Sequence, residues 1–201
     1  MFMNLKKSSI IVLVAILISS ATYAQKIKVV SGSMAYLKGK EAVGIEYDYS
    51  RLMVGKKTEG EYVSKKMEDA NKVKPGAGEE WKKAWLADRT QHYQPKFEEL
   101  LNSSTKGSGI NFSSTAKSDA KIVVVTTFIE PGYNIGVSKV PSSINLELLF
   151  MDGSTEKAKV TLVGAIGQTY GYGDFDTGIR IGESYAKAAK SLGPVIKKAL
   201  K

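Results

Sequence analysis

The sequence contains no cysteine. Disulfide bonds, thiolate nucleophiles and cysteine-ligated metal sites are therefore excluded, and so is a lipid anchor attached through cysteine. The stability of the fold has to come from a hydrophobic core, which a chain of 201 residues is long enough to build.

Histidine is almost absent as well, since His92 is the only one. A zinc site would have to take nearly all its ligands from carboxylates, which is unusual. No Gly-x-Ser-x-Gly sequence is present to indicate a serine hydrolase that uses this histidine. We expect His92 to lie on a helix surface or to pack against neighbours, and we expect no metal and no cofactor.

The sequence also lacks a hydrophobic run long enough to span a membrane. Its longest apolar run, residues 10–18, is far shorter than the roughly 20 residues that a spanning helix needs. Lys6 and Lys7 precede this run and small or polar residues follow it up to Ala24, which is the order found in a signal peptide. We therefore expect residues 1–24 to be cleaved before Gln25. Residues 25–201 would then form a single exported domain, periplasmic or extracellular, with neither a lipid anchor nor a transmembrane segment.

Acidic residues are outnumbered by basic ones. Without Lys6 and Lys7 the chain keeps 27 basic and 20 acidic residues, a net charge of +7. Such a surface favours anionic partners, although charge alone does not specify a function. We expect an anionic glycan or another envelope protein as partner and, because of export, no nucleic acid. No oligomeric state is indicated.

Hydrophobic periodicity predicts the order of the elements. Apolar residues alternate along 43–49 and 144–162, which indicates strands, and the second of these segments contains a hairpin turn at Asp152 and Gly153. Residues 121–129 are apolar on both faces, which predicts a central strand. Helical spacing predicts a helix from Thr58 to about residue 73 and a second one from about residue 79, interrupted at Pro95, with a loop over 102–109. A final helix starts after Asp176 or Thr177, and we expect Gly193 and Pro194 to split it. This order predicts an α+β fold, a two-layer sandwich in which helices pack on an antiparallel or mixed sheet.

Two short runs carry a resemblance to a known group of proteins. The Tyr-Asp-Tyr-Ser run at 47–50 and the Gly-Asp-Phe-Asp-Thr-Gly run at 173–178 resemble uncharacterised exported proteins of Bacteroidota. From about Asp119 onward, the order of elements is loosely similar to the α/β domains of curli-secretion-type envelope proteins, although the lipid-anchor cysteine of that pattern is missing. Neither resemblance implies a particular activity.

The candidate binding residues lie in the glycine-rich loop 164–178. Tyrosines on a loop beside a helix start suit the binding of an anion or a glycan, so we predict that Tyr170, Tyr172, Asp174 and Asp176 bind a ligand. No catalytic residue is predicted.

The same segment allows three other interpretations. The sequence Phe-Asp-Thr-Gly at 175–178 matches the short aspartic-protease signature, but only one copy is present and helix capping by Asp176 is favoured. Asp174, Asp176 and Glu183 are candidate calcium ligands, although their spacing departs from the calcium-loop pattern. The same three carboxylates are also the candidates for an acid–base pair.

Two apolar stripes are predicted to belong to the core. Trp81 and Trp85 share one helical face, which suits packing on the sheet better than stacking on a sugar. The stripe of the final helix, which includes Leu192 and Ile196, suits docking on the sheet better than lying on a membrane, because it holds no Trp or Phe.

The sequence as a whole favours a non-catalytic exported envelope protein that binds a ligand or a protein partner. The alternative is a hydrolase that acts on an envelope glycan or peptide through paired carboxylates. Two carboxyl groups about 5 to 10 Å apart in a cleft would favour the hydrolase.

Overall fold

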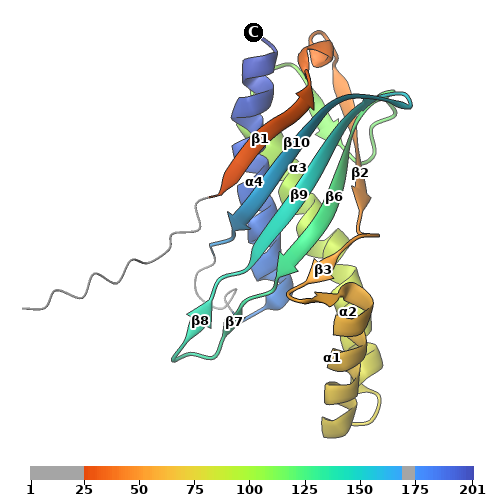
Figure 1. Ribbon diagram of the computed structural model, residues 1–201, viewed down its shortest axis with the longest axis vertical. Helices are drawn as coiled ribbons and strands as arrows, with labels where there is room; N and C mark the ends of the chain where they lie inside the picture. Colours follow the sequence, from red (N-terminus) through yellow and green to blue (C-terminus); the bar gives the residue numbers. More distant parts are fainter. Residues whose placement is uncertain (1–24, 169–174) are drawn as a thin grey trace, which may run out of the picture.

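A long antiparallel hairpin forms the centre of the fold (Figure 1). The structure is a computed structural model, and it describes residues 25–168 and 175–201. In the hairpin, β9 (Ser143–Asp152) pairs with β10 (Thr155–Ile166), and Asp152 lies opposite Thr155 beside the turn. Gly153 occupies the turn with φ +59°, a left-handed conformation that glycine adopts without steric cost. The predicted hairpin is confirmed.

The hairpin belongs to a mixed sheet with the strand order β1-β10-β9-β6-β2-β5. β1 (Lys26–Gly32) pairs with β10 in the antiparallel sense, and β6 (Ala120–Glu130) pairs in the same sense with β9. On its other side β6 pairs in parallel with β2 (Ala42–Asp48). β6 therefore has partners on both sides, as predicted for a central strand.

Short strands complete this architecture. β5 (Asn111–Ser113) pairs in parallel with β2 at the outer edge of the sheet. β3 (Met53–Val54) pairs in parallel with the end of β6, and β4 (Lys57–Thr58) pairs with β3. A separate two-stranded ribbon consists of β7 (Tyr133–Asn134) and β8 (Lys139–Val140).

Two long helices cover one face of the sheet and confirm the predicted α+β fold, with helices packed on a mixed sheet (Figure 1). α3 (Gln94–Ser104) and α4 (Thr177–Ala199) pack against each other, and α4 also contacts β9 and β10. A single 3-10 turn, η1 (Ala35–Leu37), buries Leu37 in the same core. The inward side of the sheet is apolar and fully buried, with Ile122, Val124, Leu148, Phe150, Val160 and Leu162.

The apolar stripe of α4 is docked in the core. Ile181, Tyr185, Leu192 and Ile196 have no exposed surface, whereas the lysines of the same helix face solvent. No helix within residues 25–168 and 175–201 is long and apolar enough to cross a membrane. The predicted split at Gly193 and Pro194 is wrong, since α4 continues through both. Packing of the buried residues on either side offsets the backbone hydrogen bond that proline removes.

The tryptophan stripe belongs to the hydrophobic core, as predicted, and its rings also contact the preceding helix. α1 (Glu59–Val73) and α2 (Ala77–Asp88) form a helical hairpin that extends beyond the end of the sheet (Figure 1). Trp81 and Trp85 stack with their ring centroids 5.7 Å apart, and the Tyr62 ring of α1 lies 5.2 Å from Trp85. Val63 is the one residue of α1 that is buried, so contacts among these aromatic rings hold the helical hairpin together.

The helical run through Pro95 is continuous. Between α2 and α3 the chain makes one π-helical turn, η2 (Arg89–Tyr93), and Pro95 follows directly after it at the start of α3. The changed hydrogen-bonding pattern accommodates proline, which has no N–H to donate. The predicted interruption is therefore a change of helical pitch. α3 also extends to Ser104, into the segment predicted as a loop, because Leu101 is fully buried and Thr105 bonds back to it.

Candidate functional site

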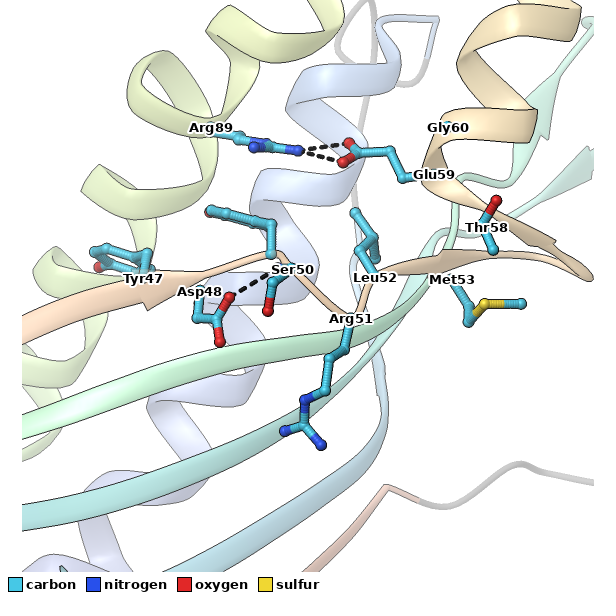
Figure 2. Close-up of a pocket in the computed structure, with 11 residues that line it drawn as sticks. Tyr47, Asp48, Ser50, Arg51, Leu52, Met53, Thr58, Glu59, Gly60 and Arg89 are labelled. Carbon is cyan, nitrogen blue, oxygen red and sulfur yellow. Dashed lines mark hydrogen bonds and ion pairs between the residues drawn. The ribbon is translucent and has the colours of Figure 1, made fainter.

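A pocket of about 610 Å³ lies at the end of β2 (Figure 2). It is lined by residues 47–53, by the start of α1 at residues 58–60, and by Arg89. Segments that are distant in the sequence thus contribute to one polar surface.

The turn after β2 is fixed by local hydrogen bonds. The Asp48 carboxylate accepts a hydrogen bond from the Ser50 backbone N–H at 2.7 Å, and the Leu52 N–H donates to the Tyr49 carbonyl at 3.1 Å. Leu52 is buried and anchors the turn to the core. The hydrogen bonds from Ser50 lower the pKa of Asp48, with a smaller contribution from the nearby Arg51 charge.

The back of the pocket is a fixed ion pair. Both carboxylate oxygens of Glu59, in the first turn of α1, accept hydrogen bonds from the Arg89 guanidinium at 2.6 Å (Figure 2). Trp85 donates its indole N–H to the same carboxylate at 2.7 Å, and the Arg89 guanidinium lies 4.2 Å from the centroid of the Tyr49 ring. Charge-assisted bonds and a cation–π contact together hold this wall rigid.

The second arginine of the pocket, Arg51, is more accessible to a ligand than Arg89. Arg51 pairs with Glu147 at 2.8 Å, but 57% of its side chain is exposed. Glu147 is also paired with Lys159 at 3.1 Å, and the hydrogen bonds from both cations lower the pKa of Glu147. An exposed pair of this kind contributes only about 0–1 kcal/mol. Arg51 can therefore exchange Glu147 for a ligand at small cost.

Buried tyrosines lie in the pocket wall and beside it. The ring of Tyr185 stacks on Tyr93 at 5.2 Å, and its hydroxyl shares a 2.6 Å hydrogen bond with Thr126. Burial raises the pKa of Tyr49, Tyr93 and Tyr185. These phenols stay neutral at physiological pH, so they contribute packing and no phenolate nucleophile.

Of the four binding residues predicted from the sequence, Asp176 alone is within the described part of the chain. Tyr170, Tyr172 and Asp174 are outside the described residues. Asp176 is the N-cap of α4, where its carboxylate accepts a hydrogen bond from the Ile179 N–H at 2.9 Å. This confirms the capping role. Asp176 does not line the pocket at β2, and its role as a ligand-binding residue stays a prediction.

The other candidates of the sequence have protein partners. Glu183 lies 3.5 Å from the Lys96 ammonium, and His92 lies 3.7 Å from Asp88 on the same helical face. Within residues 25–168 and 175–201, no group of three or more His, Asp or Glu side chains is placed to hold a metal ion.

The pocket could not be predicted from the sequence, because the segments that line it are separated along the chain and share no motif. The Tyr-Asp-Tyr-Ser run by itself indicates a strand and a resemblance to other exported proteins, but no binding site. Glu59 and Arg89 are separated by a whole helical hairpin, and nothing local in the sequence indicates that they meet.

Comparison with family models found no match, and comparison with curated proteins found none either. Among solved structures, the chain is similar to the chain described as "PelC dodecamer from Paraburkholderia phytofirmans". The identity is 13% and the TM-score 0.41, with 84% of this chain and 97% of that chain covered. A TM-score of this size is too low to transfer a function or a site from one chain to the other.

Proposed function

We propose that the protein is a non-catalytic exported envelope protein that binds an acidic glycan in the pocket at the end of β2. One observation carries the proposal. The pocket presents an exchangeable arginine beside tyrosine and hydroxyl groups, while both of its carboxylates are already engaged within the protein.

The state of these carboxylates favours binding over hydrolysis. A paired-carboxylate hydrolase needs one protonated carboxyl group as general acid. The hydrogen bonds from Ser50 lower the pKa of Asp48, and both oxygens of Glu59 accept bonds from Arg89. Asp48 is therefore unsuited to act as the acid, and Glu59 is occupied by its ion pair. Of the carboxylates predicted for that role, Asp176 caps a helix and Glu183 faces a lysine.

The arrangement suits a sugar acid in particular. A guanidinium can bind a carboxylate through two parallel hydrogen bonds, and Arg51 can turn to a uronate in this way. Ser50 lines the same pocket, and its hydroxyl oxygen can accept a hydrogen bond from a sugar hydroxyl. The Thr58 hydroxyl is already bonded to Glu61 in the capping box. The remaining pocket charges, Asp48, Glu59 and Arg89, are held by protein partners and set the shape of the site.

Arg51 provides the test of this site. We expect Arg51→Ala to weaken binding of a trigalacturonate probe at least tenfold in calorimetry and to leave the melting temperature unchanged, since its ion pair is exposed. Lys56→Ala is the matched control, because Lys56 is exposed, lies just after β3 and does not line the pocket. Equal losses in the two variants, or no binding of trigalacturonate by the native chain, would exclude the acidic-glycan assignment.

A separate prediction concerns the N-terminus of the exported protein. Because residues 1–24 have the order of a signal peptide and the chain holds no cysteine, we expect the protein recovered outside the cytoplasm to begin at Gln25 and to carry no lipid. Its intact mass measures both properties. A mass that includes residues 1–24, or an added acyl chain, would contradict export in this form.

A further inference from the structure

A second pocket, of about 350 Å³, is lined by the C-terminal end of α4. This end of α4 lies at the end of the molecule opposite the α1–α2 hairpin (Figure 1). Three segments meet there: the turn after η1, the turn after α3, and the last residues of the chain. None of them contributes to the pocket at β2.

Every charged side chain that lines this pocket is basic. Lys38, Lys106, Lys197 and Lys201 line it, and no aspartate or glutamate side chain does. None of the four ammonium groups forms an ion pair with a carboxylate in residues 25–168 and 175–201. Lys197 donates one hydrogen bond, to the Lys106 carbonyl at 3.3 Å. Four positive charges thus gather where the protein supplies little to neutralise them.

Helix dipoles do not account for all of this charge. The C-terminal ends of α3 and α4 lie here, and each carries about half a negative charge. The two helix ends and the α-carboxylate of Lys201 together contribute about two negative charges. About two of the four positive lysine charges therefore remain uncompensated. Lys38 and Lys106, moreover, lie on turns outside the helices.

Backbone donors accompany the lysines. Gly39 and Gly107 line the pocket with φ values of +81° and +88°, and a Cβ at either position would meet nothing within 4 Å. Their N–H groups make no hydrogen bond to the described part of the protein, so both remain available to a ligand. Ile110, which is buried, and Leu200, which is partly buried, add an apolar part to the lining.

We propose that this pocket binds a phosphate-bearing headgroup with at least two negative charges. Lysine is a compact point charge that binds phosphate, and several lysines beside free backbone N–H groups suit a ligand with several charged oxygens. A volume of about 350 Å³ exceeds that of a single phosphate and is at the lower end of small-molecule pockets. The ligand class is therefore a phosphorylated sugar, either free or as the headgroup of a lipid.

Pyrophosphate is the first probe, titrated calorimetrically into the full chain from residue 25 at low ionic strength. We expect binding that Lys106→Ala/Lys197→Ala weakens at least tenfold. The control variant, Lys82→Ala/Lys83→Ala, removes the same charge from an exposed stretch of α2 and should bind as the native chain does. Because the lysines replaced in both variants are exposed, the melting temperatures of the two variants should agree with that of the native chain.

Vesicles distinguish the two sources of phosphate. Co-sedimentation with phosphatidylcholine vesicles containing 20% diphosphoryl lipid A, whose headgroup is a sugar with two phosphates, lost in Lys106→Ala/Lys197→Ala and displaced by pyrophosphate, would identify a lipid headgroup. Pyrophosphate binding without co-sedimentation would identify a free phosphorylated sugar. The proposal is overturned if pyrophosphate does not bind, or if the α2 control loses as much affinity as the pocket variant. Arg51 does not line this pocket. The lysine variants therefore test the phosphate site alone, and Arg51→Ala tests the glycan site alone.

Discussion

Leu192→Asp is expected to abolish the native fold. Leu192 has no exposed surface and lies in the middle of the stripe by which α4 docks in the core. Loss of a buried leucine side chain costs about 2–5 kcal/mol, and a buried unpaired carboxylate adds several more. The sum approaches the total stability of a domain, about 5–15 kcal/mol. Circular dichroism in a urea titration should show no cooperative transition.

Two further variants make this result specific. Leu192→Ala should remain folded with a loss of about 2–5 kcal/mol, which gives a measurable value if the aspartate variant does not express. Lys190→Asp places the same carboxylate on the exposed side of α4 and should change stability by no more than about 0.5 kcal/mol. A native-like transition in Leu192→Asp would mean that α4 is not docked and would favour the membrane-surface alternative.

Gly193→Leu is expected to produce the second largest loss, about 3 kcal/mol. A Cβ at Gly193 would lie 2.2 Å from the Ser104 hydroxyl oxygen and 3.0 Å from its carbonyl carbon, so α3 and α4 would have to separate. Leucine is a far better helix former than glycine, so helix propensity alone predicts a gain. A loss in urea unfolding would therefore report the close contact between the helices.

Gly60→Leu is the matched control for this contact. Gly60 also lies in a helix, but a Cβ there meets nothing within 4 Å. We expect this variant to be as stable as the native chain or up to about 1 kcal/mol more stable. If both leucine variants shift stability in the same direction, α3 and α4 are not held in contact at Gly193.

The parts of the fold that could be predicted from the sequence depend on neighbours along the chain. Asp152 and Gly153 encode the hairpin turn, and Asp176 encodes the start of α4. Thr58 begins α1 through a capping box with Glu61, whose side chain and backbone bond back to the threonine. Each signal lies within about four residues, so no knowledge of the tertiary structure is needed.

The features that were missed depend on contacts between distant segments. Whether Trp85 faces the sheet or α1 is decided by where α1 goes, and the same apolar spacing serves both. The pocket at β2 requires Glu59 to meet Arg89 from another helix. Periodicity identifies which face of an element is apolar, but it does not identify the partner of that face.

The pairing of β1 has a consequence for the order of folding. The first strand of the described chain has β10 as its partner, with Lys26 opposite Val163 and Gly32 opposite Ala158. A loop that contains nearly all the other strands must close before this pairing can form, and such closure costs chain entropy that local contacts do not. β9 and β10 can form their hairpin early, because a single tight turn joins them. β1 then adds to the free edge of β10 in a late step, so the N-terminal segment of the domain stays unpaired until almost the whole chain has been made.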